Sequence, residues 1–431
     1  MSLTVTEHHL PNGLKVMLKE IHSAAIISHW IWYRVGSRDE IPGGTGLSHW
    51  VEHMQFKGTP QFPGSLLDKA ISREGGVWNA FTFVDWTTFL ETMPADKIDL
   101  ALQLEADRMV NSNFDPEEVE SERTVIISER QGHENEPVFQ LSEAMRAAAF
   151  KVHPYHHEII GDMADLRTIQ RDALYQHYRR YYVPNNAVLS IAGDFETEAM
   201  LERIHKLFDP IKKGAQPPRL QRPEPPQNGE HRITIEGPDD TVYVKANYRA
   251  PSATNADFFP FVILDSLLTG ASGLNMFGGG ISNKTSRLYR RLIDGDLAVG
   301  VYGNLPVTID PFIYAITLTV HPERRSPEVL AALDEEIDRI QNTPPTEDAI
   351  QRALKQAKAL FAYGSESISN QAFWLGFSEM FDHYDWFTSY LDRLAEVTPD
   401  QVQRIAQSYL RPQNRIVGTY LPTNNSTEVK V

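Results

Sequence analysis

Residues 172–194 read DALYQHYRRYYVPNNAVLSIAGD, and residues 400–422 read DQVQRIAQSYLRPQNRIVGTYLP. At a constant offset of 228 residues, Pro184 in the first segment corresponds to Pro412 in the second. Each segment begins with an Asp suited to a helix start, continues as an amphipathic helix, turns at Pro and Asn, and ends in an apolar strand. A single repeat at so long a period predicts two duplicated domains rather than a solenoid.

A proline-rich segment separates the two copies. Residues 212–229 read KKGAQPPRLQRPEPPQNG, which is rich in proline and polar residues and poor in apolar ones. This composition predicts an extended linker between a first domain over residues 1–211 and a second over residues 230–431. The length of 431 residues agrees, because it is about twice that of one compact domain.

Hydrophobic periodicity gives a coarse order of elements in each half. Strands and helices mix without strict alternation, so the predicted class is α+β, with a mixed or antiparallel sheet and helices in each domain. The glycine-rich segment 270–280 lacks the Lys-Ser/Thr ending of a phosphate loop, so we expect a loop that binds no nucleotide. In the first half the pattern predicts strands over 4–19, 24–35, 77–93 and 187–192 and helices over 46–56, 63–73, 95–110, 116–131 and 171–181. In the second half it predicts strands over 232–248 and 298–320, a helix over 258–268, three further helices and a last strand.

Composition excludes several classes of function. The formal net charge is -16, which disfavours nucleic-acid binding because that requires a basic face. There is no cysteine, so disulfides, thiolate catalysis and Cys-based zinc sites are excluded. No apolar run reaches the roughly 20 residues of a membrane span, and the first 19 residues do not read as a signal peptide. We therefore expect a cytoplasmic protein without a membrane anchor.

The main chemical motif is His49-Trp50-Val51-Glu52-His53, within the predicted helix over 46–56. Residues four apart share one helix face, so both imidazoles can reach one metal ion. Glu52 can lie beside that ion without binding it, where a carboxylate can take a proton from metal-bound water. The alternative is a surface helix that carries two histidines by chance.

Two histidines require a third ligand from elsewhere in the chain. The helix that begins at Asp115-Pro116 places Glu122, Ile126 and Glu129 on one face. A carboxylate pair on that face offers one ligand and one partner that orients it. From the residues alone, a solvated acidic helix is the simpler interpretation.

A resemblance to a known family decides between these interpretations. The segment TGLSHWVEHMQFKGT, residues 45–59, resembles the signature of the pitrilysin, insulysin and mitochondrial processing peptidase family, inverzincins with the motif His-x-x-Glu-His. In that family the third ligand is a Glu about 76 residues after the second His, with another functional Glu seven residues earlier. Glu129 and Glu122 occupy these two positions. The resemblance implies zinc ligands at His49, His53 and Glu129, with Glu52 as general base and Glu122 as a catalytic carboxylate that orients a ligand.

Further matches extend the resemblance over nearly the whole chain. Residues 11–14 (PNGL) resemble the opening hairpin, and residues 286–289 (SRLY) match the second domain. Residues 75–82 (GGVWNAFT) resemble the family's edge strand, where an extended peptide can pair through main-chain hydrogen bonds. Asn79 and Ala80 are therefore predicted substrate-binding residues, although a polar residue beside a turn also explains Asn79. The family implies a two-domain bacterial-type subunit, closed like a clam shell around a peptide substrate, with one zinc per chain.

The second half departs from the family. Active single-chain and homodimeric members place an Arg and a Tyr seven residues apart in this domain, where they hold the substrate carbonyl and oxyanion. Aligned on Leu297-Ala298, the matching positions here are Ile293 and Val299, which lie six rather than seven residues apart. We therefore expect a zinc endopeptidase subunit that needs a related partner chain in a heterodimer, with a homodimer as the alternative. A non-catalytic scaffold subunit is the competing function, but a scaffold has no need of the complete motif.

Overall fold

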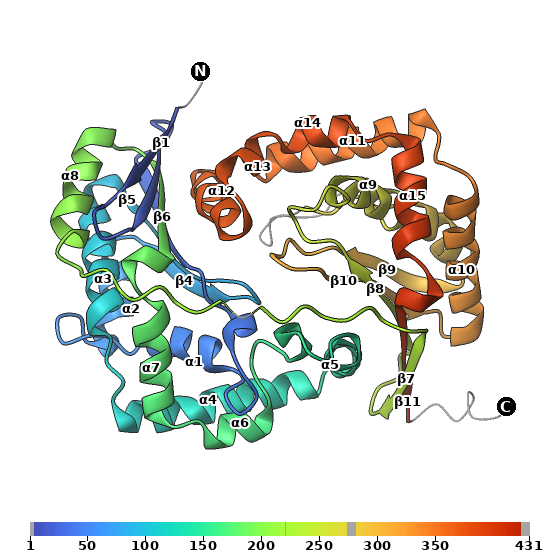
Figure 1. The fold of residues 1–431 in the computed structure, drawn as a ribbon, viewed down its shortest axis with the longest axis horizontal. Helices are drawn as coiled ribbons and strands as arrows, with labels where there is room; N and C mark the ends of the chain where they lie inside the picture. Colours follow the sequence, from blue (N-terminus) through green and yellow to red (C-terminus); the bar gives the residue numbers. More distant parts are fainter. Residues whose placement is uncertain (1–3, 220, 274–281, 424–431) are drawn as a thin grey trace. The chain divides into compact units, whose positions relative to one another are not determined.

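The chain folds into two compact units (Figure 1), each built from segments that are not contiguous in sequence. The computed structural model describes residues 4–219, 221–273 and 282–423, so most of the glycine-rich segment 270–280 lies outside the described residues. The first unit comprises Met1–Gln131, His157–Arg222 and Ser365–Phe387, and the second comprises Gly132–His156, Pro223–Gly364 and Thr388–Val431.

The first unit contains a six-stranded sheet in the order β1-β2-β6-β3-β5-β4. Strands β2 and β6 are parallel and the other neighbours are antiparallel. Strand β4 lies at one edge, as the sequence predicts for residues 77–82. The strands are β1 (Val5–His9), β2 (Lys15–Glu20), β3 (Ile26–Tyr33), β4 (Val77–Thr82), β5 (Thr87–Pro94) and β6 (Ala187–Gly193).

The second unit repeats this topology in a five-stranded sheet of order β7-β11-β8-β10-β9. Again the first pair, β7 and β11, is parallel and the others are antiparallel, which matches β2-β6-β3-β5-β4 strand for strand. The matching topology confirms the α+β class with two similar domains. The strands are β7 (His231–Gly237), β8 (Tyr243–Ala250), β9 (Ala298–Asn304), β10 (Phe312–Val320) and β11 (Arg415–Pro422).

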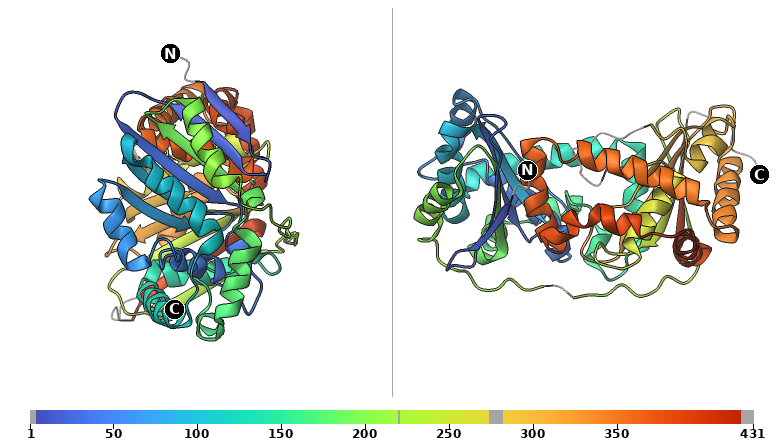
Figure 2. Two further views of the ribbon diagram at one scale, coloured as in Figure 1. Left: turned by 90° about the vertical axis from the view of Figure 1, so that its left-hand side faces the viewer. Right: turned by 90° about the horizontal axis from the view of Figure 1, so that it is seen from above.

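The repeat found in the sequence coincides with elements of the structure. Helix α7 (Arg171–Tyr181) and helix α15 (Pro399–Tyr409) begin 228 residues apart, and so do strands β6 and β11. Between the copies, the described part of residues 212–229 contains no helix or strand, and the right-hand view of Figure 2 shows it as an extended connection. The repeat unit is therefore a helix followed by a central strand of its sheet.

Helices cover both faces of the first sheet (Figure 1). Helices α3 (Ile98–Asn111) and α8 (Thr197–Phe208) lie on one face, and α12 (Ile368–Phe381) lies on the other. Because successive side chains of a strand alternate between faces, Trp30 and Trp32 of β3 both meet α12. Their rings lie 5.5 Å from the ring of Phe373, which is 1% exposed. This aromatic cluster forms the core between sheet and helix.

The two halves of the chain exchange one helix each. Helix α12 comes from the C-terminal half but belongs to the first unit, while α5 (Pro137–Ala149) comes from the N-terminal half and packs on β7, β8 and β11 of the second. The predicted domains over 1–211 and 230–431 therefore differ from the compact units in these two segments. Each exchanged helix therefore packs on strands that come from the other half of the chain.

Some helices and strands differ from those that hydrophobic periodicity predicts. Helices α5, α6 and α8 have no counterpart among the predicted elements, and six α-helices, α10 to α15, lie between β10 and β11 where three were predicted. The strand predicted over 4–19 is two strands joined by a turn in which Gly13 has a φ of 91°. Within the described residues, no helix is long and apolar enough to span a membrane. The other α-helices are α1 (Leu47–Met54), α2 (Gly64–Arg73), α4 (Pro116–Glu134), α6 (Met163–Thr168), α9 (Phe258–Leu268), α10 (Ser326–Asn342), α11 (Glu347–Tyr363), α13 (Tyr384–Thr388) and α14 (Tyr390–Ala395).

The exchanged helix α12 gives a stability prediction. Replacing Phe373 by Ala should lower the free energy of unfolding by about 3–5 kcal/mol, because the cavity left beside Trp30 and Trp32 cannot close fully. Urea unfolding followed by tryptophan fluorescence measures the change. Tyr363→Ala is the control, since that side chain is 67% exposed and its loss should cost less than about 0.5 kcal/mol. Equal effects of the two substitutions would show that α12 is not part of the core.

Candidate metal centre

Helix α1, which carries the His-x-x-Glu-His motif, begins at a fixed point. Gly46 precedes it with a φ of 89°, and a Cβ there would lie 2.6 Å from the carbonyl oxygen of Ile160, so only glycine fits. The buried carboxylate of Glu40 accepts hydrogen bonds from the amide of Gly46 at 2.8 Å and from that of Ser48 at 2.7 Å. His157 contacts Glu40 at 3.0 Å. Together these groups satisfy free amides at the start of α1 and hold it in place.

The ligand atoms of the three predicted metal ligands lie close together. The Nε2 atoms of His49 and His53 are 3.3 Å apart, and Oε2 of Glu129, on α4, is 3.9 Å from the first and 3.7 Å from the second. Within the described residues, this is the one group of His, Asp and Glu side chains whose ligand atoms are close enough to share a metal ion. The structure therefore brings together the ligands that the resemblance implies.

The geometry of this group fits zinc. Around a tetrahedral zinc with bonds of about 2.1 Å the ligand atoms lie roughly 3.4 Å apart, and the three separations here, 3.3, 3.7 and 3.9 Å, are close to that spacing. Two imidazoles and one carboxylate are a typical ligand set for a catalytic zinc, which keeps its fourth position for water or substrate. His49 and His53 are half-buried and Glu129 is exposed, so the site is accessible. The chain can thus hold zinc with its own side chains.

Glu122 orients one of the ligands. Its Oε1 lies 2.8 Å from Nδ1 of His53, which leaves Nε2 of that ring directed at His49 and Glu129. Burial opposes ionisation of Glu122, but its contacts with His53 and Lys57 outweigh burial and lower the pKa of its carboxyl. An ionised carboxylate on the far side of a ligating imidazole fixes the ring and increases its basicity.

Helix α4 is held against α1 by two further contacts. The guanidinium of Arg123 lies 4.7 Å from the ring of the buried Trp50, and it donates a hydrogen bond of 2.7 Å to the carbonyl oxygen of Ile169. The ammonium of Lys57 pairs with Glu122. These contacts fix the rotation of α4, so Glu129 faces the two histidines.

Glu52 is buried beside the ligands, and burial raises its pKa to about 7. Thr82 of β4 donates a hydrogen bond of 2.6 Å to Oε2 of Glu52, which opposes part of that rise. A carboxyl whose pKa lies near neutrality can both accept and return a proton at the working pH. Thr82 holds one carboxylate oxygen and leaves Oε1 for that exchange.

The predicted substrate residues lie on β4, apart from the metal ligands. Ala80 is 6% exposed and shares its face of the strand with Thr82, while Asn79 points to the opposite face and is exposed. The side-chain oxygen of Asn79 accepts a hydrogen bond from the amide of Ala80 at 2.9 Å. Asn79 and Ala80 therefore lie on an edge strand, and their contact with a peptide stays a prediction.

In the second unit, the two positions that depart from the family pattern lie beside the edge strand β9. Ile293 ends the short helix η5 (Tyr289–Ile293), and Val299 is 56% exposed on β9. The nearby Arg291 is paired with Glu335 at 2.8 Å. Neither position carries a hydrogen-bond donor in its side chain.

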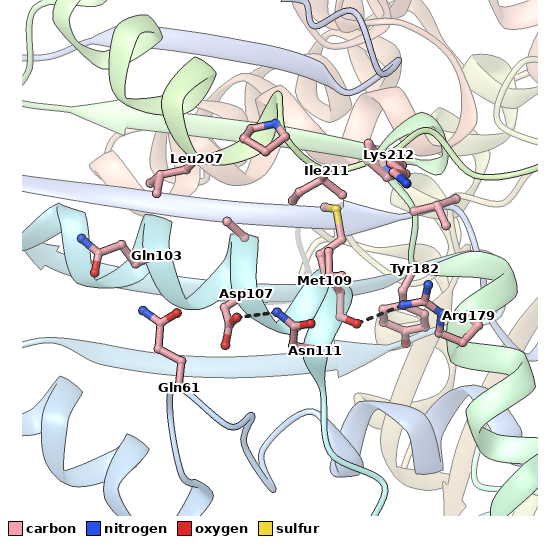
Figure 3. Close-up of a pocket in the computed structure, with 15 residues that line it drawn as sticks. Gln61, Gln103, Asp107, Met109, Asn111, Arg179, Tyr182, Leu207, Ile211 and Lys212 are labelled. Atoms are coloured by element: carbon pink, nitrogen blue, oxygen red, sulfur yellow. Dashed lines mark hydrogen bonds between the residues drawn. The ribbon is translucent and has the colours of Figure 1, made fainter.

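A cavity of 480 Å³ in the first unit is separate from this group. Figure 3 shows it between Asp107 and Asn111 of α3, Leu207 of α8 and Lys212 of the linker. None of the ligands, nor Glu52, lines it. The candidate metal centre therefore lies outside this cavity.

Several supporting residues were not predicted from the sequence. Glu40, Thr82 and His177 belong to this set; Oγ of Ser48 lies 3.2 Å from Nε2 of His177, on α7. Alternation along the predicted edge strand places Thr82 on the same face as Ala80, which is a usable signal. Glu40 and His177 lie far from the motif in sequence or on another element, and nothing in the local pattern identifies them.

Known proteins match this chain in sequence and in fold. A model of the family named Insulinase (Peptidase family M16) matches residues 15–163, and the model named Peptidase M16 inactive domain matches residues 168–357. The chain belongs to peptidase family M16. This confirms the resemblance to the pitrilysin and processing-peptidase family. The first match contains the His-x-x-Glu-His motif and Glu129, and the second contains Ile293 and Val299.

Relatives in family M16 include named zinc proteases. An uncharacterized zinc protease of Streptomyces coelicolor is 25% identical over 426 residues, covering 96% of this chain and 90% of the relative. A probable mitochondrial-processing peptidase subunit beta of Arabidopsis thaliana is 28% identical over 272 residues, covering 63% of this chain and 51% of that protein. The crystal structure of a protease from Helicobacter pylori has a TM-score of 0.90 at 24% identity, covering 97% of this chain and 100% of that one. At that identity the last match supports the fold alone.

The support of α1 by His177 predicts a pH dependence of stability. Burial lowers the pKa of His177 to about 3, whereas an exposed histidine titrates near about 6.5. The unfolded chain therefore binds the extra proton first, and stability falls as the pH drops from about 6.5 toward 3. At pH 5 this loss amounts to about 2 kcal/mol for the one group.

His177→Gln should remove that loss, because the amide does not titrate. Between pH 7 and pH 5 the variant should lose about 2 kcal/mol less stability than the wild type, measured by chemical denaturation at each pH. His383→Gln serves as control, since that side chain is 78% exposed. A wild-type slope in the His177 variant would contradict the buried neutral histidine.

Proposed function

We propose that this chain is the zinc-binding subunit of an endopeptidase. The observation that carries the proposal is the convergence of His49, His53 and Glu129 beside a buried carboxyl, Glu52, with the geometry of a zinc site. The names of relatives in family M16 support the class zinc protease. One zinc per chain follows from the single group of ligands in the described residues.

Bound zinc would polarise the scissile carbonyl and lower the pKa of its water. Side chains of this chain transfer the proton and position the reacting groups. Oε1 of Glu52 accepts a proton from the attacking water and later returns it to the leaving amine. Thr82 fixes the other oxygen of that carboxylate, and Glu122 keeps His53 in the orientation that ligation requires.

The edge strand β4 is the proposed docking place for the peptide. An extended peptide can add to a free edge through main-chain hydrogen bonds that do not depend on its sequence. Val77, at the start of β4, is 64% exposed, and Asn79 is exposed as well, so the edge is open to solvent. Thr82 at the end of the same strand contacts Glu52, so a docked peptide extends toward the base.

We further propose that catalysis needs a related partner chain. The developing oxyanion of peptide hydrolysis requires hydrogen-bond donors. By the resemblance described in the sequence analysis, Ile293 and Val299 stand where active members of the family carry an Arg and a Tyr, and neither side chain can donate a hydrogen bond. The naming of the plant relative as a subunit agrees with a paired arrangement. A heterodimer is preferred over a homodimer because a second copy of this chain would lack the same donors.

A scaffold role without catalysis is the alternative. It is disfavoured because the three ligands converge, Glu122 contacts the ligand His53, and Glu52 lies in the same motif with Thr82 holding its carboxylate. The cytoplasmic location remains a prediction from the sequence.

The assignment of the base is tested by Glu52→Gln. This change should reduce peptide cleavage by at least about 1,000-fold, since the amide cannot accept the proton of water. The zinc content should stay near that of the wild type, because Glu52 is not a ligand. Cleavage is followed with a quenched fluorescent peptide, in the presence of the partner, and zinc by mass spectrometry. Wild-type cleavage by this variant would remove Glu52 from the mechanism.

The partner requirement is tested by mixing. The purified zinc-loaded chain should cleave peptides slowly alone and at least about 100-fold faster with a related chain that carries the Arg and Tyr, since removing oxyanion donors costs that much. A matched control replaces that Arg and Tyr in the partner by Ile and Val. Full activity of the chain alone would contradict the paired arrangement and leave the zinc site intact.

A further inference from the structure

A cavity in the second unit has a lining in which every charged side chain is an arginine. It measures 330 Å³, and Arg287, Arg290 and Arg352 line it. Among the described residues, no Asp or Glu contributes to the lining. This contrasts with the chain as a whole, which has 57 acidic and 41 basic residues. Such a lining attracts anions.

The three arginines come from two separate elements. Arg287 lies two residues before η5 and Arg290 lies within it, so they are one helical turn apart. Arg352 lies on α11, on the same face as Ala349 and Gln356, which also line the cavity. A hydrogen bond of 3.3 Å from Gln356 to Thr285 joins the two sides. The cavity therefore has arginines on two sides, of which Arg287 is half-buried and Arg290 and Arg352 are exposed.

These arginines have no partner in the part of the chain that the structure describes. Their guanidinium groups make no hydrogen bond or ion pair there, whereas the adjacent Arg291 pairs with Glu335 at 2.8 Å. Guanidinium groups gathered in one place repel one another unless an anion lies between them. The cavity is thus supplied with positive charge that the described residues do not compensate.

The hydroxyl of Ser266 is a second, independent sign of a ligand. Ser266 lines the cavity and is 8% exposed, and its Oγ has no hydrogen-bond partner in the described residues. A buried hydroxyl without a partner is costly, and in native proteins it usually bonds to a ligand or water. Its position in the wall lets it donate to an oxygen of a bound anion.

The start of α11 adds to the same potential. This helix has 17 residues, and its capping residue Thr346, which lines the cavity, accepts a hydrogen bond from the amide of Ala349. The positive end of the helix dipole therefore lies at the cavity wall. The acidic Glu347 and Asp348 of the first turn are exposed and do not line the cavity.

We propose that this cavity binds a small molecule with two or more linked phosphate groups. Guanidinium groups match the oxygens of phosphate with paired N–H donors. The three positive charges of the arginines offset the negative charge of a diphosphate. A ligand with a single carboxylate would leave two of those positive charges unbalanced. This site is separate from the proposed peptidase centre, because it shares no residue with the metal ligands.

Pyrophosphate titrated into the full-length chain, with heat as the readout, tests the proposal. One saturable site is expected, and Arg352→Gln should weaken binding at least tenfold. Arg411→Gln is the matched control, because Arg411 is also exposed, has no side-chain partner in the described residues and does not line the cavity. Absence of saturable binding, or equal binding by the two variants, would overturn the proposal.

Two further variants and a competing anion distinguish this cavity from binding elsewhere on the chain. Ser266→Ala should weaken binding without lowering the melting temperature, since its hydroxyl has no described partner to lose. His53→Ala, which breaks the metal group, should bind pyrophosphate as the wild type does; loss of binding there would assign the anion to zinc instead. Citrate bound as tightly as pyrophosphate would contradict the preference for phosphate.

Discussion

The buried carboxylate of Glu40 is the contact on which the metal centre depends. Its oxygens accept hydrogen bonds from the backbone amides of Gly46 and Ser48, and these bonds fix where helix α1 begins. The directions of the side chains of His49, Glu52 and His53 follow from that start. Position 46 requires glycine, because its backbone is left-handed and a Cβ there would clash with the carbonyl oxygen of Ile160. A helix displaced by one residue would turn the two imidazoles away from α4.

Contacts between α1 and α4 then bring the third ligand to the two histidines. The stacking of Arg123 on Trp50 and the bond between Glu122 and His53 set the rotation of α4, which brings Glu129 to the histidines. Each group has a clear electrostatic state: Glu122 stays ionised through His53 and Lys57, while burial gives Glu52 a pKa suited to proton exchange. In the proposed function, the surroundings of Glu129 and Glu52 thus suit one carboxylate to ligation and the other to acid–base chemistry.

Much of this arrangement could be predicted from the sequence, because the spacing of four residues on one helix and the duplicated helix–strand segment are local patterns. The third ligand could not be found that way: Glu129 was one acidic residue among several on α4 until the resemblance identified it. The exchange of α5 and α12 was also missed, since amphipathic helices do not encode which sheet they cover. Thr82, Glu40 and His177 act through contacts between distant segments, which periodicity does not report.

The most direct test of the metal centre is a crystal of the zinc-soaked chain measured on both sides of the zinc absorption edge. We expect one anomalous peak that appears only above the edge, bonded to Nε2 of His49, Nε2 of His53 and the carboxylate of Glu129 at about 2.0–2.2 Å. Glu122 should remain hydrogen-bonded to His53 without touching the ion. A fully soaked crystal with no peak at this position, or with zinc held by other residues, would contradict a zinc centre built from these three side chains.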